Sequence, residues 1–566
     1  MKLFNIHICV LTALIALCSC TKGFEEINTN PNEFAEVHPG YLFNTSVFRT
    51  LDASCGAIKK IALDNYAQYN YGQTNQFGRY GNVPSTNNSY FKNFYNGALL
   101  PVHMIVEEYE GNEEYSNRTI IAKIWRSYLF SQVASIWGPV PMSQALSGKT
   151  SIPYDDEPTI YLNLLTTLKE CADNIDMEGD VFANDPIYPD KTGKSDLLKW
   201  KKFANSLRLR LAVRICNADK ALATEHLIEL MADETMLMES NADNCVAKWG
   251  DNEVTRNYYY DYFIIQTQNV DKTNAAGEGF LMHTAPYDDP RLPRFFTPCT
   301  NSKMPADFHW APWWGTPKTD HTPVSGMLDS SNPHSGTPAT SYAVMQNDFF
   351  AMDYAQTIMS FAEVSLLKAE AGHLGLATGS KALSTYYTEG VRASMQQFGV
   401  TDAAAIETYL STDGIEWGTV VDTESNPEGE AYYMDYLKLS SGAIKDTEDD
   451  PIYHQIIMQQ YIAMFNQAID AWTLIRRSQV LDLPPHYQPE TGYGAVNAGS
   501  DDVKFSYIPQ RFAYPSSEVQ DNNAEVEKAI SSYLEGGEDA LDTKLWWAKP
   551  QLINKRLQQL VDNYKK

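Results

Sequence analysis

The strongest restriction on the fold comes from apolar stripes that repeat at helical spacing. Along 117–137 the stripe advances by three or four residues at each step and consists of Ile121, Trp125, Leu129, Val133 and Ile136. Such steps place all of these side chains on one face of an α-helix, and Gly138-Pro139 ends it. Further helices are predicted over about 42–65, 158–175, 195–216, 221–234, 355–376, 380–398, 452–480, 523–534 and 549–564. The chain is therefore predicted to be mainly α.

Two stretches depart from the helical pattern. Residues 66–96 interleave aromatic side chains with Asn, Gln, Gly and Ser, which indicates a long loop running into the next helix. Residues 240–345 are rich in Pro, Gly, Asn, Asp and aromatics, and a long irregular insertion in a helical domain is often functional. We therefore predict a helical scaffold over about 42–235 and 350–566, with a loop-rich ligand-binding insertion over about 240–345. Helix pairs joined by short turns favour tetratricopeptide-like hairpins, although no clean period of about 34 residues is present.

The N-terminus has the layout of a bacterial secretory signal. Lys2 is followed by a short apolar run that closes with Leu17-Cys18-Ser19-Cys20. The run is too short to span a bilayer, and a small residue precedes the expected cut. This pattern looks like a lipobox, so residues 1–19 are predicted to be removed and Cys20 to carry lipid. The alternative is an ordinary cleaved signal with an incidental cysteine. In either case the mature chain would work outside the cytoplasm.

The charge balance restricts the partners. The chain has 71 acidic and 44 basic residues, for a net charge of −27. Such a charge argues against nucleic acid as a partner and against charge-driven binding to an anionic membrane face. Any membrane contact is therefore expected through the lipid anchor only.

Motifs for metal, phosphate or covalent chemistry are missing from the sequence. The cysteines after Cys20 show no CxxC spacing, and the chain has no HExxH, no Gly-rich phosphate loop and no GxSxG elbow. We therefore expect no cofactor, no disulfide framework and no zinc site. Asp288-Asp289 and Glu448-Asp449-Asp450 are candidates for structural calcium, but ordinary turns explain them equally well.

Aromatic residues in polar loops supply the candidate ligand contacts. Indole and phenol rings stack on the apolar faces of sugar rings, while amides bond the hydroxyls. The first candidate set is Trp310, Trp313 and Trp314. The second lies in the stretch 69–80 and comprises Tyr71, Gln73, Asn75, Arg79 and Tyr80. The third is Tyr258 and Tyr260. For the first set, the alternative is that the tryptophans plug the seam between the insertion and the scaffold. For the second, it is a loop that packs on the core or on a partner protein. For the third, it is a strand with one buried face.

Several charged residues lie on helices that otherwise look like core. Arg210 and Arg214 are four residues apart on one face of the predicted helix that also carries Arg208. Glu363 and Glu370 share a face of another helix, and Arg476-Arg477 closes a third. We interpret all of these as scaffold, with the two glutamates as buried partners of the arginines, rather than as a binding or acid–base site.

Eight segments, taken in order, resemble one family. They are CTKGFEEINTNPNE (20–33), IWGPVPMSQAL (136–146), KWKKFANSLRLRLAVRI (199–215), DDPRL (288–292), FAEVSLLKAEAGHLG (361–375), DAWTLIRRSQ (470–479), PQRFAYPSSEVQDN (509–522) and LWWAKP (545–550). Together they are similar to the SusD/RagB-type nutrient-binding outer-membrane lipoproteins, in the SusD-like branch. The resemblance implies a tetratricopeptide-like helical fold and a lid on a SusC-type TonB-dependent outer-membrane transporter. It also implies capture of an oligosaccharide at the cell surface, without catalysis.

Two other functions compete with glycan capture. A RagB-like protein would bind peptide or protein instead of sugar. An all-helical (α/α) barrel glycosidase or lyase would also be long, acidic and rich in aromatics, and would need a pair of carboxylates flanking the bond. With 71 acids in the chain, composition does not separate the enzyme from the binding protein.

Overall fold

A computed structural model describes residues 38–71, 84–266, 275–299, 313, 343–420, 450–481, 483 and 508–549. The predicted signal, Cys20 and nearly all of the helix predicted over 549–564 lie outside these ranges. Within them, no helix is both long and apolar enough to cross a bilayer.

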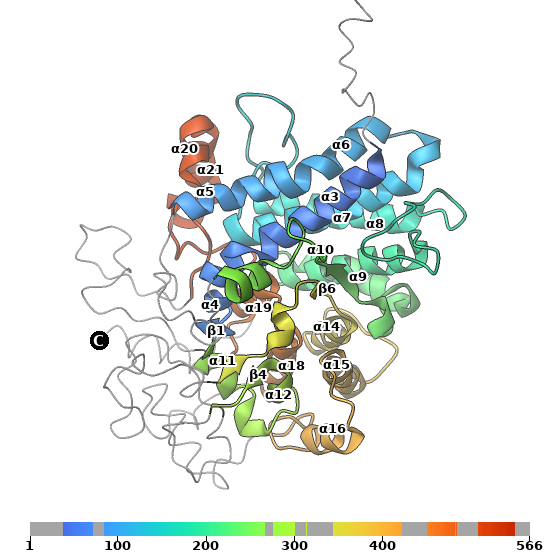
Figure 1. Cartoon of the computed structure of the whole chain (residues 1–566), viewed down its shortest axis with the longest axis vertical. Coiled ribbons are helices and arrows are strands. Elements are labelled where there is room, and N and C mark those ends of the chain that lie inside the picture. Colours follow the sequence, from blue (N-terminus) through green and yellow to red (C-terminus); the bar gives the residue numbers. More distant parts are fainter. Residues whose placement is uncertain are drawn as a thin grey trace, which may run out of the picture.

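Helices dominate the structure, as predicted. In the first half of the chain, α3 (Pro39–Cys55), α6 (Leu100–Tyr109), α7 (Ser116–Trp137) and α8 (Glu157–Asn174) lie side by side in the upper part of Figure 1. They are followed by α9 (Leu197–Ile215) and α10 (Lys220–Ala232). The second half supplies α14 (Phe361–His373), α15 (Leu383–Gln397), α16 (Ala403–Leu410), α18 (Pro451–Ala463), α19 (Ala468–Ser478), α20 (Ser516–Asp521) and α21 (Asn523–Tyr533).

Local chemistry sets the ends of these helices. The side chain of Asp196 accepts the amide of Lys199 at 3.2 Å and thereby caps α9. The helix α7 ends at Gly138, whose φ is +82°. A Cβ there would lie 2.6 Å from a methyl group of Leu545, so the position requires glycine both for its backbone and for the close approach of the C-terminal segment.

Two predictions about regular structure are wrong. The single helix expected over 452–480 is the pair α18 and α19, interrupted at Asn466, which has a φ of +72°. Both helices are buried on nearly all sides, so the apolar pattern continues across the break. The loop expected over 66–96 instead contains β1 (Asn70–Tyr71), α5 (Pro84–Lys92) and the π-helix η3 (Asn93–Leu99). The aromatic residues at its end are buried core residues of α5 and η3: Tyr90, Phe91, Phe94 and Tyr95.

The C-terminal segment 508–549 folds back onto the end of α7. The guanidinium of Arg476 lies between two indoles, 3.5 Å from the ring centroid of Trp472 and 4.9 Å from that of Trp547. It also donates to the carbonyl oxygens of Ser135 (2.7 Å) and Gln510 (2.6 Å). The Arg-Arg and Trp-Trp strings of the sequence therefore serve to join remote parts of the scaffold.

The pH dependence of stability is expected to reflect Glu157, which is buried under this C-terminal segment. Its Oε2 accepts the amide of Trp546 at 2.8 Å, and burial raises its pKa from 4.5 to about 7. Because the folded state holds this proton more tightly than the unfolded chain, the stabilisation is full below about pH 4.5 and is lost as pH rises through about 7. Glu157→Gln should therefore raise the free energy of unfolding at pH 8 by up to about 3 kcal/mol, with little change at pH 4.5.

Urea unfolding at a series of pH values measures this effect. The control is Glu527→Gln on the exposed side of α21, which should leave the pH profile as in the wild type. An unchanged profile in Glu157→Gln would contradict the assignment.

The insertion is built on a small sheet rather than on loops alone. The strand order is β1, β3 (Ala275–Ala276), β5 (Val344–Met345) and β4 (Phe296–Thr297), with every neighbouring pair antiparallel. A second pair joins β2 (Cys245–Lys248) to β6 (Ala355–Met359). The first sheet unites the segment after α3 with three separate parts of the insertion.

Candidate ligand-binding face

The described part of the insertion presents one aromatic surface, which we call the tyrosine segment (residues 256–266). It is helical from Tyr258 onward and ends in the π-helix η7 (Tyr260–Gln266). Asn257 fixes its start, because its side chain accepts the amide of Tyr259 at 3.0 Å and donates to the carbonyl oxygens of Phe349 and Ala351 at 3.0 and 3.1 Å. The strand that we kept open as an alternative for Tyr258–Tyr262 is therefore wrong.

The tyrosine segment has an inner and an outer side. Tyr259 and Phe263 are buried against Phe350, with ring centroids 5.9 and 5.2 Å from its ring. Tyr258 and Tyr262 are partly exposed, and their rings lie nearly parallel, at 19° with centroids 6.0 Å apart. Burial, and then the neighbouring Tyr262, raise the pKa of Tyr258 to about 12, so the hydroxyl of Tyr258 is a protonated donor at neutral pH.

A buried ion pair holds this segment on the scaffold. The π-helix η1 (Lys59–Leu63) and α4 (Asp64–Tyr66) continue from α3 beneath it. The ammonium of Lys59 lies 3.0 Å from the carboxylate of Asp64 and donates to the hydroxyl of Tyr259 at 3.1 Å. That hydroxyl donates to Asp64 in turn. The outer tyrosines are thereby positioned by a buried polar cluster under the inner one.

Two of the predicted candidate regions start from the same sheet. Tyr71 of β1 pairs with Ala275 of β3, which in turn pairs with Val344 of β5. The stretch after Tyr71 leaves from β1, at one edge of this sheet, and the stretch between β4 and β5 leaves from β4, at the other edge. The remaining candidates of these stretches lie outside the described residues: Gln73, Asn75, Arg79, Tyr80, Trp310 and Trp314.

Two residues of the predicted aromatic stretches lie in or against the hydrophobic core. Trp313 is half-buried and packs against the hydrophobic core, in keeping with the plug that we kept as an alternative. Tyr69, the first residue of the second stretch, is buried, stacks on Tyr461 with centroids 5.0 Å apart and donates to the Tyr461 carbonyl oxygen at 2.7 Å. Tyr69 is therefore a packing residue. Tyr260, in contrast, is partly exposed, with the guanidinium of Arg256 5.9 Å from its ring centroid.

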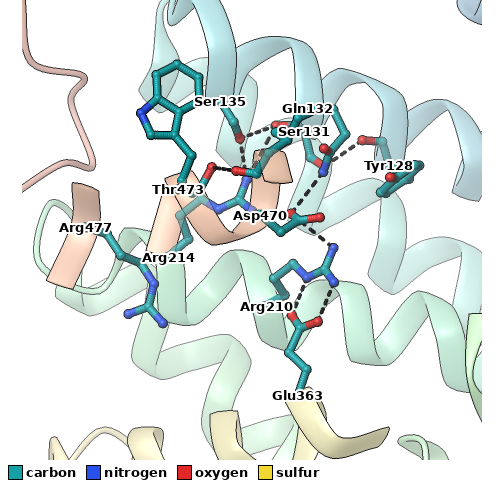
Figure 2. Close-up of polar contacts among 12 residues, drawn as sticks. Tyr128, Ser131, Gln132, Ser135, Arg210, Arg214, Glu363, Asp470, Thr473 and Arg477 are labelled. Carbon is teal, nitrogen blue, oxygen red and sulfur yellow. Dashed lines mark hydrogen bonds and ion pairs between the residues drawn. The ribbon is translucent and has the colours of Figure 1, made fainter. Parts of the chain in front are cut away.

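The arginines and glutamates of the scaffold form buried ion pairs, as predicted. Figure 2 shows Arg210 of α9 between Glu363 of α14 and Asp470 of α19. Its Nη2 donates to Glu363 at 2.6 Å, and its Nη1 lies 3.4 Å from Asp470. Arg477 donates to Glu370 at 2.7 Å. None of these groups lies on the tyrosine segment, so they stabilise the scaffold.

Two further arginines differ in detail from the prediction. Arg208 pairs with Glu229 at 2.7 Å, near the surface. Arg476 bonds backbone carbonyl oxygens and indole rings rather than a carboxylate among the described residues.

Two of the acidic candidates for calcium are engaged elsewhere, and Glu448 and Asp449 lie outside the described residues. Asp289 pairs with Arg291 at 2.7 Å, and Asp450 caps α18 by accepting the amide of Tyr453 at 3.0 Å. In the described ranges no group of three or more His, Cys, Asp or Glu side chains is arranged to hold a metal ion. The five cysteines there are free: Cys55, Cys171, Cys216, Cys245 and Cys299.

Sequence reasoning missed two residues of the face, Tyr262 and Lys60. Tyr262 lies four residues after Tyr258, the helical spacing, but the run Tyr258-Tyr259-Tyr260-Asp261-Tyr262 fits a strand equally well. Lys60 lies beneath Tyr262, its Nζ 3.9 Å from the ring centroid. That contact joins residues 202 positions apart in the chain (262 − 60), and the sequence carried no signal for it.

Comparison with known proteins identifies the family. Residues 31–515 match the SusD-like family described as starch-binding and associating with the outer membrane. No curated protein matches significantly. Among solved structures, a SusD homolog from Parabacteroides distasonis is 20% identical, with a TM-score of 0.68 over 91% of this chain and 98% of that one. A chitin-binding SusD homolog from Flavobacterium johnsoniae is 19% identical, with a TM-score of 0.67 over 90% and 99%. The helical fold of these relatives and the long sequence match show that the chain belongs to the SusD-like family.

Proposed function

We propose that this chain is a cell-surface glycan-binding lipoprotein. It captures an oligosaccharide and passes it to a SusC-type TonB-dependent outer-membrane transporter, while the lipid on Cys20 holds it to the outer membrane. The family description as starch-binding and outer-membrane-associated and the chitin-binding relative support the ligand class. The observation that carries the proposal is the tyrosine segment, with its partly exposed, nearly parallel rings held on a buried polar cluster.

The chemistry of the face suits sugar rings. Tyr258 and Tyr262 offer flat apolar surfaces for the C–H faces of a pyranose, and their hydroxyls can bond to ring substituents. The candidate loops around Tyr71 and between β4 and β5 begin at the neighbouring sheet. We therefore propose that Tyr258, Tyr260, Trp310 and Trp314 contribute to one composite glycan site, whereas Trp313 packs on the core.

Replacing both outer tyrosines should weaken glycan binding strongly. Tyr258→Ala with Tyr262→Ala removes two stacking rings, so the dissociation constant should rise roughly 10-fold or more, at about 0.5–1.5 kcal/mol for each ring contact. A glycan array followed by calorimetry on the best hit measures the loss. The pair Trp310→Ala and Trp314→Ala tests the loop candidates in the same assay.

The matched control is Tyr533→Ala on α21, remote from the tyrosine segment in sequence. Its affinity should equal that of the wild type, and thermal unfolding should show that all variants are folded. Wild-type affinity in both double variants would remove the site assignment.

The two competing functions give different results in the same preparation. A RagB-like peptide binder would give hits on a peptide library and none on the glycan array. A glycosidase or lyase would release new reducing ends from a polysaccharide. The fold favours binding over catalysis, because it is SusD-like rather than an (α/α) barrel. In addition, Glu363, Glu370 and Asp470 form buried ion pairs with arginines.

A further inference from the structure

Two consecutive lysines lie under the tyrosine segment, and they differ in whether a carboxylate pairs with the ammonium. Lys59 forms an ion pair with Asp64 and donates to Tyr259, as described above. Lys60 is only 8% exposed. Its Nζ lies 3.9 Å from the ring centroid of Tyr262 and 5.7 Å from that of Phe263. Across the described ranges, its ammonium forms no ion pair and no hydrogen bond.

This arrangement leaves a cation without a counterion in the part of the chain that the structure describes. An ammonium has three N–H donors and no acceptor, and the Nζ of Lys60 reaches water at the surface instead of a carboxylate. The ring faces compensate in part, because a cation over an aromatic ring gains about 0.5–2 kcal/mol. An anion that arrives at Tyr262 would supply the missing partner.

A second cation, Arg256, lies on the tyrosine segment itself. Arg256 pairs with Asp261 through one end of its guanidinium, while its Nε is buried without a hydrogen-bond partner among the described residues. Because Asp261 neutralises Arg256, Lys60 is the cation next to these rings that has no carboxylate partner among the described residues, in a chain whose net charge is −27. Since the overall charge repels anions at long range, a local cation is what would allow this face to accept one.

We infer that the ligand is an acidic oligosaccharide, with a sugar ring on Tyr258 and Tyr262 and its carboxylate on the ammonium of Lys60. The inference rests on the proposed glycan-binding function and names the class of glycan. A neutral sugar would satisfy the rings but leave Lys60 without an anion. A carboxylated sugar satisfies both, because the ring that stacks also carries the charge.

The test uses Lys60→Met, which keeps an apolar chain against Tyr262 and removes the charge. The control is Lys248→Met, which removes a charge from an exposed ion pair with Asp353. Both variants and the wild type are probed on an array of neutral, uronic-acid and sialic-acid oligosaccharides, beside a peptide library. Each acidic hit is then titrated by calorimetry next to its methyl ester, which has the same rings without the charge.

We expect the glycans bound by the wild type to carry carboxylates. Their affinity should fall roughly 10- to 100-fold in Lys60→Met, as for loss of a hydrogen bond to a charged group, and stay unchanged in Lys248→Met. The methyl esters should bind the wild type and Lys60→Met equally. Hits confined to neutral glycans, or equal affinity of wild type and Lys60→Met for acidic ones, would overturn the inference and leave glycan binding intact. Binding to peptides alone would overturn the proposed function as well.

Discussion

Replacing Arg291 by methionine should lower the free energy of unfolding by about 3–5 kcal/mol, because it leaves a buried carboxylate without its counterion. Arg291 is fully buried, and its guanidinium donates to both oxygens of Asp289, at 2.9 and 2.7 Å. The same group donates to Ser394 of α15 and to Gln459 of α18, each at 2.8 Å. One side chain thus fastens the insertion to two helices of the scaffold.

Urea unfolding and hydrogen exchange measure this loss. The amides of 275–299 should exchange faster in Arg291→Met than in the wild type, because the insertion loses its attachment. The matched control is Arg294→Met in the short helix α12 (Leu292–Phe295), which begins directly after Arg291. There the side chain is exposed and the expected change is below about 0.5 kcal/mol.

The double variant Arg291→Met with Asp289→Asn separates two explanations. Since the second change removes the unpaired charge, it should recover part of the lost stability. A double variant that is no more stable than Arg291→Met would show that shape, rather than charge, accounts for the loss.

Replacing Arg210 by methionine should lower the free energy of unfolding by a similar amount. Glu363 is completely buried and Asp470 is nearly so, and both face this guanidinium. Removing it leaves two carboxylates in the interior, with Arg214 3.5 Å from Asp470 as the remaining cation. We expect a loss of about 3–5 kcal/mol in urea unfolding. Arg210→Lys should lose less, because it keeps the charge but not the bidentate geometry.

The control for this prediction is Arg392→Met, the same chemical change on an ion pair with Glu407 whose side chains are 41% and 58% exposed. Exposed pairs contribute between 0 and about 1 kcal/mol. If the two variants lost equal stability, the buried network would not be the source of the scaffold's stability.

The sequence predicted the regular helices and the buried charges well, for a shared reason. The helices α7 to α10 carry stripes that must face a core, and arginines on such stripes require buried partners, which Glu363 and Glu370 provide. The prediction failed where helices are irregular. The π-helix η3 departs from the spacing of an α-helix, and a positive φ at Asn466 interrupts a pattern that stays apolar on both sides.

The candidate site was less predictable, because its geometry depends on contacts between remote segments. The tyrosines were recognised by composition, but their orientation follows from Asp64 and Lys59, nearly 200 residues earlier in the chain. The role of Lys60 likewise becomes visible only when Tyr262 is placed above it. Lipidation of Cys20 and ligand contact by Trp310 and Trp314 remain predictions.

The short four-stranded sheet has a consequence for how such proteins can diversify. Its strands are joined through main-chain hydrogen bonds, which do not depend on which side chains the intervening segments carry. New sequences can therefore be exchanged between these fixed attachment points while the helices remain untouched. Transplanting the stretches between β1 and α5, and between β4 and β5, from one relative to another would be a practical way to change the ligand specificity of such a protein.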